Sequence, residues 1–441
     1  MKSIITLLLL SIAVTAIAQS QISDSDLERY SDLLTSNYIH YDKSVKIFNA
    51  IDNGLYDFPT LSEAPEGYTP FYISHYGRHG SRYHYSSFDY DWWSNTFETA
   101  LNEGYFNETG VKVCEDMLAI CKNAKGRAGD LTAQGRAQHQ GIAKRMFQNF
   151  PEVFNVAGAT IDAKSTTVPR CIISMSSFCQ ELRAQLPSLT INTDAGECFQ
   201  YFMNPHSKDK NPYNDSTEWK SSREAFYKSQ NNSMECSKLF KEPEEAAKRF
   251  NMQRINSAIY DAASTLQGVD IEGVDALRTF LSHEGNVNAY MSSNFYWYSS
   301  NACVPQLGGT MNCKKITPLL EKFVEEAEAV ISGTSTLRAN LRFGHDSALL
   351  PLLCLMNVNK AGDELADFKT MYHSWSASRY IPMAGNIQII FYRNNANPDS
   401  EILVKILQNE SEASLPIGKG PYYKWNEVKA YWQQRITDCN R

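Results

Sequence analysis

The chain lacks several features that would place it in familiar functional classes. It has no internal repeat, no low-complexity tract and no linker rich in proline, glycine or serine, and no long apolar run follows its first residues. The missing apolar runs argue against membrane insertion, and the missing linkers argue against domains joined in series. A formal net charge of −7 provides no generally basic surface for nucleic acid or anionic membranes.

Metal-binding patterns are also missing. No Cys-x-x-Cys occurs, which argues against a zinc knuckle and a thioredoxin-type redox site. His75 and His79 have the spacing of a helical zinc pair, but Gly77 and the apolar residues before it favour a strand. In a strand, residues four positions apart stand about 13 Å apart, which is too far for one ion. The sequence therefore predicts no metal and no cofactor.

The first residues have the pattern of an export signal. Residues 4–16 form a short, mainly apolar run behind Lys2, and residues 16–18 have the small-x-small pattern of a cleavage site. We therefore expect residues 1–18 to be a signal peptide and the mature protein, beginning at Gln19, to be periplasmic or secreted.

Ten cysteines follow this segment, and an even number in an exported chain allows disulfides. Two local pairs, Cys114–Cys121 and Cys303–Cys313, are the first that we expect. Cys354 lies within an apolar run, so we expect it to be a buried free thiol.

Strand-like segments occur near both ends of the mature chain. Residues 68–76 are rich in β-branched and aromatic side chains and predict a strand that runs into a tight loop. Residues 159–182 predict a strand, a loop around Arg170 and a helix, and residues 337–356 predict a strand, a turn and a helix. Residues 379–410 predict two antiparallel strands.

The intervening residues have a different character. From about 185 to 332 the chain has charged amphipathic stretches, and one predicted helix has Thr317 as N-cap, Pro318 at its first position and Gly333 after its end. We therefore expect a core from residues 19–184 and 333–441, with a mainly helical cap inserted at 185–332. In such a sheet, ligands bind beyond the carboxyl ends of the strands.

Residues 78–84, Arg-His-Gly-Ser-Arg-Tyr-His, combine arginines with histidines. Guanidinium groups stay charged and bind phosphate through two parallel hydrogen bonds. Arg78, Arg82 and a third arginine from another loop would surround a phosphoryl group and stabilise its transfer without a metal. These cations would keep the imidazole of His79 neutral, with a ring nitrogen free to attack phosphorus.

These residues resemble a known family. Arg-His-Gly-Ser-Arg at 78–82 resembles the Arg-His-Gly-x-Arg signature of the histidine acid phosphatases (clade 2 of the histidine phosphatase superfamily), and Gly-His-Asp-Ser at 344–347 resembles their second signature, His-Asp. Residues 131–141 and 170–178 resemble further family segments, above all those of the branch that contains the multiple inositol polyphosphate phosphatases and phytases.

The resemblance implies a three-layer α/β core with a central mixed sheet and a helical cap. It implies that His79 is the nucleophile that becomes phosphohistidine and that Asp346 protonates the leaving group. It implies a phosphate-binding set of Arg78, Arg82, Arg170 and His345. The expected substrate is a small phosphomonoester, with inositol polyphosphates favoured, and the expected partners include no nucleic acid and no membrane.

Two positions depart from the family pattern. His84 stands where the first signature usually has proline, and it would either touch substrate or face solvent. Ser347 stands where the inositol polyphosphate branch often has the glutamate of His-Ala-Glu, so Asp346 must be the proton donor. Two alternatives stay open, a broad-specificity acid phosphatase and a non-catalytic phosphate-binding protein. A set of cations in the predicted cap would either form a solvated helix face or supply extra charge for a polyphosphate: Lys208, Lys210, Lys220 and Arg223.

Overall fold

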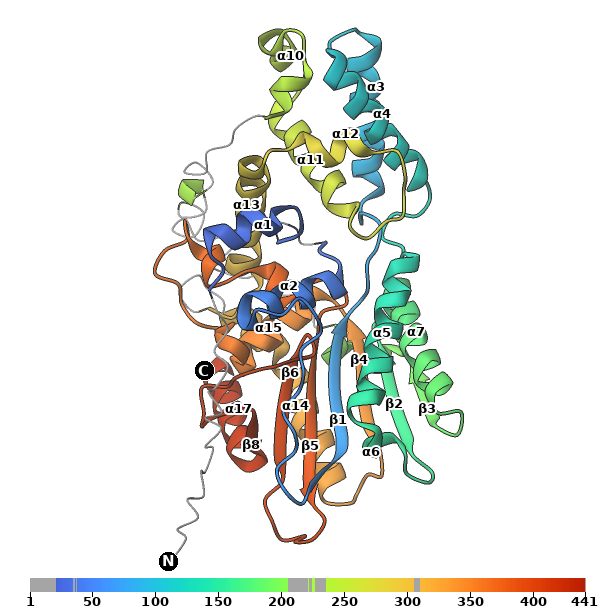
Figure 1. Ribbon diagram of the computed structural model, residues 1–441, viewed down its shortest axis with the longest axis vertical. Coiled ribbons are helices and arrows are strands. Elements are labelled where there is room, and N and C mark those ends of the chain that lie inside the picture. The colour runs from blue at the N-terminus through green and yellow to red at the C-terminus, as the bar shows by residue number, and fades with distance from the viewer. Residues whose placement is uncertain are drawn as a thin grey trace, which may run out of the picture.

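A computed structural model describes residues 21–34, 36, 38–204, 221, 224–226, 235–304 and 310–440. The predicted signal peptide, residues 1–18, lies outside these residues. A β-sheet flanked by helices occupies one part of the molecule, and a group of helices occupies the other (Figure 1).

The sheet is mixed, as expected. Its strands are β1 (Tyr68–Arg78), β2 (Thr160–Ser165), β3 (Thr190–Asp194), β4 (Ala339–Gly344), β5 (Asn386–Asn394), β6 (Leu403–Gln408), β7 (Ser411–Glu412) and β8 (Tyr422–Lys424). They follow the order β3-β2-β4-β1-β5-β6-β7, and β8 pairs with β6. The strands β3, β2, β4 and β1 are parallel, whereas β5 is antiparallel to both β1 and β6. This confirms the predicted strand at 68–76 and the predicted antiparallel strands within 379–410.

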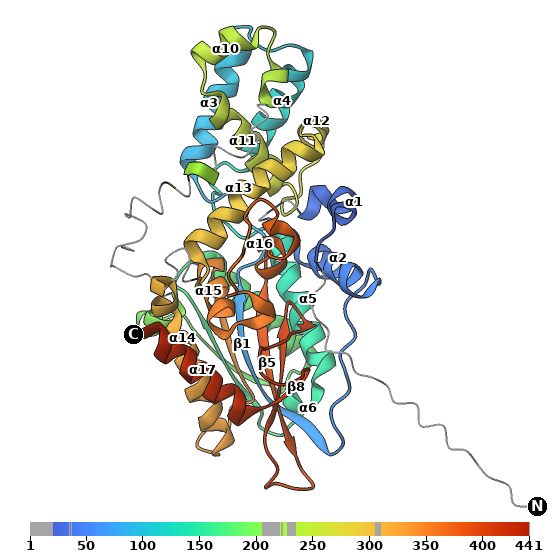
Figure 2. The ribbon, with the colours of Figure 1, turned by 90° about the vertical axis from the view of Figure 1, so that its left-hand side faces the viewer.

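Helices cover both faces of the sheet, which gives the three layers that we expected (Figures 1 and 2). One face carries α5 (Ala133–Asn149), α6 (Pro151–Phe154) and α7 (Pro169–Gln185), and the other carries α14 (Thr310–Ile331), α15 (Asp346–Met356) and α17 (Trp425–Asn440). Side chains of alternate residues of β1 lie on opposite faces of the sheet. Tyr72 and Tyr76 lie in the core beneath α14, α15 and α17, whereas Ile73 lies in the core beneath α5 and α7.

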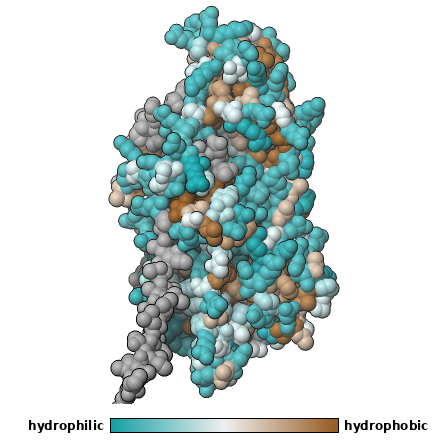
Figure 3. All heavy atoms as spheres, in the orientation of Figure 1, coloured by the Kyte–Doolittle hydropathy of each residue, from teal (hydrophilic) through white to brown (hydrophobic). Residues whose placement is uncertain are grey.

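The outer surface is mostly hydrophilic. The face shown in Figure 3 is largely teal, with apolar residues in scattered patches. Within the described residues, no helix has both the length and the apolar character that a membrane span requires.

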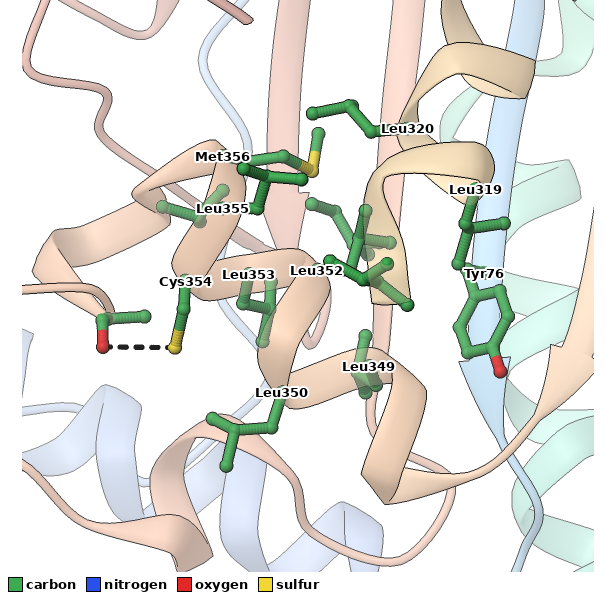
Figure 4. Close-up of a cluster of buried hydrophobic side chains, with 14 of the residues drawn as sticks. Tyr76, Leu319, Leu320, Leu349, Leu350, Leu352, Leu353, Cys354, Leu355 and Met356 are labelled. Carbon is green, nitrogen blue, oxygen red and sulfur yellow. Dashed lines mark hydrogen bonds between the residues drawn. The ribbon is translucent and has the colours of Figure 1, made fainter. Parts of the chain in front are cut away.

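The most apolar helix, α15, is anchored in the sheet core. Its buried side chains belong to one core with Leu319 and Leu320 of α14 and Tyr76 of β1, and Leu350 and Cys354 point away from these three residues (Figure 4). The buried residues of α15 are Ala348, Leu349, Leu350, Pro351, Leu352, Leu353, Cys354, Leu355 and Met356. Each fully buried leucine contributes about 1.5–3 kcal/mol of transfer free energy. Because α15 begins at Asp346, this packing fixes the position of that carboxylate relative to β1.

The helices far from the sheet form a second core, which we call the helical end. It consists of α3 (Ser87–Asn102), α4 (Glu108–Asn123), α10 (Pro243–Arg249), α11 (Met252–Thr265) and α12 (Asp275–Phe280), and α13 (His283–Asn301) runs from it toward the sheet (Figure 2). Two short helices, α1 (Asp24–Leu34) and α2 (Tyr41–Asn53), lie beside the sheet domain.

The elements are distributed differently from the division at 184/185 and 332/333 that the sequence suggested. The helices α3 and α4 come from the predicted core segment, whereas β3 and α14 come from the predicted cap segment and belong to the sheet and its cover. An amphipathic pattern shows that a helix buries one face, but it does not identify the partner of that face.

The start of α14 also differs from the prediction. The helix begins at Thr310 and contains Pro318 in its interior, so Pro318 is not its first residue. A proline nitrogen cannot donate to the carbonyl four residues earlier, which is that of Lys314. The hydroxyl of Thr317 donates to the Lys314 carbonyl instead, at 3.0 Å. This hydrogen bond offsets the loss and lets the helix continue through the proline.

All ten cysteines lie in the described residues, and all ten are free thiols there. Cys114 and Cys121 are both in α4, seven positions apart, which corresponds to about 10 Å along the axis and exceeds the reach of a disulfide. The expected pair Cys114–Cys121 is therefore wrong. Cys354 is buried and its thiol donates to the Ala361 carbonyl at 3.1 Å, which confirms it as a buried free thiol.

Candidate active site

The two signature segments meet because β1 and β4 are parallel neighbours. Arg78 at the end of β1 is in register with Gly344 at the end of β4. The residues that follow both strands therefore leave the sheet at the same edge. The backbone N–H of His79 donates to the Gly344 carbonyl at 2.9 Å, and this bond holds the two loops together.

His79 has one ring nitrogen available for chemistry. Its Nδ1 lies 2.9 Å from the carbonyl oxygen of Gly80. A carbonyl only accepts, so Nδ1 carries the hydrogen and Nε2 keeps its lone pair. The ring of His345 lies edge-on to that of His79, with centroids 5.8 Å apart.

The surroundings of His79 favour its neutral form. Burial is the main cause that lowers the pKa of this imidazole well below its usual value, and the charges of three arginines lower it further. They are Arg82, Arg78 and Arg170, in decreasing order of effect. A neutral imidazole beside three cations is suited to attack an anionic phosphoryl group.

The three arginines come from three different elements. Arg78 ends β1, Arg82 lies in the loop after it, and Arg170 lies in the first turn of α7, where we had expected a loop. The N-termini of α7 and α15 lie at the same edge of the sheet, and the partial positive charge of helix N-termini favours anions. Among the described residues, Nε of Arg82 and Nε of Arg170 are buried donors without a hydrogen-bond partner.

The carboxylate of Asp346 is paired with an arginine of this group. Its Oδ2 lies 2.7 Å from Nη2 of Arg78, and its Oδ1 accepts a bond from the Ser347 N–H at 2.8 Å. Burial on its own raises the pKa of Asp346, but the charges of Arg78 and Arg82 outweigh it and hold the pKa below its ordinary value. Without substrate, Asp346 is therefore ionised.

His345 is held by residues that the sequence did not single out. Its backbone N–H donates to the Tyr76 hydroxyl at 3.2 Å, and its Nε2 lies 3.2 Å from Oγ1 of Thr166. The Cys171 thiol lies 3.7 Å from the same nitrogen. Thr166 directly follows β2, which is the other parallel neighbour of β4. Residues that follow parallel strands lie at the same edge of the sheet, so this position would have indicated Thr166 as a site residue.

The loop after His79 is pressed against α5 and α7. A Cβ on Gly80 would lie 2.3 Å from the Gly135 carbonyl oxygen, so only glycine fits there. The N–H of Ser81 donates to Gln138 Oε1 at 2.8 Å. The N-cap of α5, Thr132, accepts from the Gly135 N–H, and its own hydroxyl donates to the Ser81 carbonyl. Residues 131–141 therefore pack against the Arg-His-Gly segment and support its conformation.

His84 and Tyr85, at the end of the loop, differ in solvent exposure. His84 is 4% exposed and does not face solvent, because its ring nitrogens contact Tyr38 and Asp89. Tyr85 is 63% exposed, and its ring centre lies 5.7 Å from Cζ of Arg82. Tyr85 also lies near Arg170, because a Cβ built on Gly129 would contact both Nη1 of Arg170, at 3.5 Å, and Cα of Tyr85, at 3.8 Å. Tyr85 therefore lies at the rim of the arginine group.

All six predicted site residues therefore lie at one edge of the sheet. The cap cations suggested for a polyphosphate (Lys208, Lys210, Lys220 and Arg223) lie outside the described residues. Within the described part of the chain, no three side chains of His, Cys, Asp or Glu are grouped as metal ligands.

Comparison with known proteins identifies relatives of this chain. A family model described as the histidine phosphatase superfamily (branch 2) matches residues 77–409. Human multiple inositol polyphosphate phosphatase 1 is 27% identical over 104 residues, which are 22% of this chain and 21% of that protein. The aligned region thus spans about a fifth of this curated relative.

Solved structures show the same fold. The multiple inositol polyphosphate phosphatase of Bifidobacterium longum, in complex with phosphate, matches with a TM-score of 0.71 and 18% identity, over 92% of this chain and 97% of that chain. The phytase from D. castellii matches with a TM-score of 0.57 and 14% identity, over 86% of this chain and 82% of that chain. At these identities the likeness concerns the fold alone.

Proposed function

We propose that this chain, which belongs to the histidine phosphatase superfamily (branch 2), hydrolyses phosphomonoesters through a phosphohistidine intermediate. The observation that carries the proposal is the neutral His79, whose Nε2 keeps its lone pair among three arginines. Arg78, Arg82, Arg170 and His345 bind the phosphoryl group of the substrate, and His79 attacks it.

The first step transfers the phosphoryl group to the protein. Nε2 of His79 forms a bond to phosphorus while the bond from phosphorus to the ester oxygen breaks, and the arginines neutralise the charge on the equatorial oxygens. The bond from Nδ1 to the Gly80 carbonyl fixes the ring and stabilises the positive charge that the ring acquires.

Asp346 supplies the proton that the leaving alkoxide needs. It is ionised and paired with Arg78 before substrate binds. A phosphate dianion competes for Arg78 and adds negative charge beside the carboxylate, and both effects raise the pKa of Asp346. The protonated acid then gives its proton to the ester oxygen. In the second step Asp346 takes a proton from the attacking water as the bond between phosphorus and Nε2 breaks.

The favoured substrates are inositol polyphosphates. The proposal is supported by the similarity to the human and Bifidobacterium longum phosphatases, whose names specify that class. It is also supported by the exposed Tyr85 ring beside Arg82, which offers an apolar face to the ring of a cyclic polyol. A broad-specificity acid phosphatase is the alternative, and it would hydrolyse simple and polyanionic esters at similar rates.

Trapping of the intermediate tests the reaction. Wild-type protein quenched in the steady state with a labelled phosphomonoester is expected to carry one acid-labile, base-stable phosphate, and His79→Ala is expected to carry none. Activity should survive chelators and be inhibited by vanadate. Phosphate binding without phosphoenzyme or turnover would favour the non-catalytic alternative, and loss of activity in chelator would favour a metal mechanism.

Export of the protein is part of this proposal. Cleavage after Ala18 would release a chain that begins at Gln19. N-terminal sequencing of the protein recovered outside the cytoplasm tests it. An oxidising compartment would also allow the remaining expected disulfide, Cys303–Cys313, because Sγ of Cys313 lies 3.9 Å from the carbonyl oxygen of Cys303.

A further inference from the structure

The residue that departs from the family signature, His84, lies in a series of contacts that starts at the phosphate site. The guanidinium of Arg82 lies over the ring of Tyr38, with Cζ 5.1 Å from the ring centre. The Tyr38 hydroxyl lies 3.3 Å from Nδ1 of His84. Nε2 of His84 lies 3.0 Å from Oδ2 of Asp89.

The direction of both hydrogen bonds of the His84 ring is fixed by chemistry. The Asp89 carboxylate only accepts, so Nε2 of the neutral His84 ring carries the hydrogen and donates it. Nδ1 of His84 then keeps its lone pair and accepts the hydrogen of the Tyr38 hydroxyl. Each donor has one acceptor, and the chain has a single consistent arrangement.

The surroundings favour this neutral form of His84. Burial is the largest cause that lowers the pKa of His84, and the Arg82 charge lowers it further, although Asp89 opposes both effects. The ring is packed among Tyr85, Tyr90 and Trp93. The Tyr90 hydroxyl also accepts the His84 backbone N–H at 2.9 Å, so this part of the loop is rigid.

The chain of bonds ends on the helical end. Asp89 lies in the first turn of α3, and its Oδ1 is 3.8 Å from Nη2 of Arg254 on α11. Ser86, the N-cap of α3, accepts the Asp89 N–H at 3.1 Å and fixes the start of that helix. A proline at position 84 has no ring nitrogen that can join such a chain.

We propose that His84 is a positioning residue that holds the guanidinium of Arg82 at the phosphate site through Tyr38 and ties it to α3 and α11. The inference rests on the proposed function, because it takes Arg82 as a phosphate ligand. His84 itself does not touch the reacting atoms. Through His84, the affinity of the site for phosphate depends on a contact with the helical end.

A double-mutant cycle on phosphate binding tests this proposal. Affinity for inorganic phosphate is measured by calorimetry on the full mature chain, without turnover, for Tyr38→Phe, His84→Leu and the double variant. Each single change is expected to weaken binding about three- to tenfold, as for loss of one buried hydrogen bond, because the Tyr38 ring beneath Arg82 is then no longer held in place. Since both changes break the same chain of bonds, the double variant is expected to bind no more weakly than either single variant.

Two further variants separate positioning from packing. His84→Gln can still accept from Tyr38 and donate to Asp89, so it is expected to bind phosphate within about twofold of wild type. Tyr423→Phe, a matched loss of a buried hydroxyl that accepts from Leu415 N–H far from the site, is expected to leave binding unchanged. If His84→Leu does not fold, Tyr38→Phe and His84→Gln still decide the matter.

The outcomes distinguish this inference from the proposed function. Wild-type affinity in Tyr38→Phe, or additive losses in the double variant, would overturn the positioning role while leaving the phosphatase reaction intact. Phosphate binding with the expected non-additive losses, but without any phosphoenzyme, would uphold the positioning role and overturn the proposed function. Wild-type protein that binds no phosphate would overturn both.

Discussion

The carboxylate of Asp346 lies 2.7 Å from Nη2 of Arg78, so the proposed proton donor and a proposed phosphate ligand form an ion pair before substrate arrives. The same arginine cannot bind the carboxylate and a substrate phosphate equally well at once. Binding of phosphate therefore weakens the pair and raises the proton affinity of Asp346 at the moment when an acid is required.

Asp346→Asn is expected to lower turnover without lowering the affinity for phosphate. Turnover of alkyl phosphates should fall by about 10²- to 10⁴-fold, because an amide cannot protonate the alkoxide. Turnover of p-nitrophenyl phosphate should fall far less, since that leaving group is stable as an anion. Affinity for inorganic phosphate should be unchanged or higher, because Arg78 loses its competing partner. Ser347→Ala is the control and should be mild. Equal losses on both substrates would assign Asp346 a structural role.

The pH dependence of activity follows from the same ion pair. Arg78 and Arg82 hold the pKa of Asp346 below its ordinary value despite burial, so the acid form is scarce at neutral pH. For alkyl phosphates, kcat/KM is therefore expected to rise as the pH falls, which gives an acidic optimum. In the pH profile of kcat, the decline in activity should begin at a higher pH, because bound phosphate raises the pKa of Asp346. A profile for alkyl phosphates as flat as that for p-nitrophenyl phosphate would contradict this assignment.

Acid should also destabilise the fold, through two buried histidines beneath the site. Burial lowers the pKa of His139 to about 3 and that of His75 well below its usual value. Below pH 6.5 these histidines take up protons in the unfolded chain but not in the folded one. Each can therefore lower the free energy of unfolding by up to about 1.4 kcal/mol per pH unit as the pH falls from 6.5 toward the folded-state pKa.

Urea denaturation at pH 7 and pH 5 measures this effect. His139→Leu, in a site lined by Phe178 and Phe343, is expected to lose less stability between the two pH values than wild type does. His283 is exposed, and His283→Gln is expected to retain the wild-type loss. If His139→Leu has the wild-type pH dependence, His139 is not a source of acid sensitivity.

Tyr85 is expected to contribute to recognition of the substrate ring. Tyr85→Ala should raise KM for inositol hexakisphosphate roughly three- to tenfold, and Tyr85→Phe should restore it, because the contact uses the ring face. Inhibition by inorganic phosphate should change by less than about twofold, since the arginines remain. Tyr56→Ala, which removes another exposed tyrosine, serves as the control. An equal rise in the inhibition constant of phosphate would mean that Tyr85 supports the arginines instead.

Peptide mapping without reductant tests the disulfide prediction. Sγ of Cys313 lies 3.9 Å from the carbonyl oxygen of Cys303, and Cys439 lies in the same buried core. Protein from an oxidising compartment is expected to yield a peptide pair linked by a Cys303–Cys313 disulfide. In Cys303→Ser, Cys313 is expected to form a disulfide with Cys439 instead. Cys354 should remain alkylatable after unfolding. Alkylation of all ten cysteines without reductant would show that the exported protein has no disulfide.

The strands and the chemistry of the site were accessible from local sequence. The β-branched and aromatic residues of 68–76 predicted β1. The Arg-His-Gly-Ser-Arg and Gly-His-Asp-Ser segments indicated five site residues, and the segment at 170–178 indicated the sixth, Arg170. The fold brings all six to one edge of the sheet. The boundaries of the helical regions were less accessible. Pro318 suggested a helix start but lies inside α14, because the Thr317 hydroxyl replaces the missing backbone donor.

The sequence by itself determined which residue types stand after which strands, because hydrophobic period and side-chain chemistry are local properties. Only the tertiary structure decided which of them touch. The register of β1 on β4 pairs Asp346 with Arg78, and the packing of α3 and α11 against the loop buries His84 against Asp89. The pairs Asp346–Arg78 and Asp89–Arg254 join segments far apart in the chain. They follow from how whole elements bury their apolar faces, which no local pattern specifies.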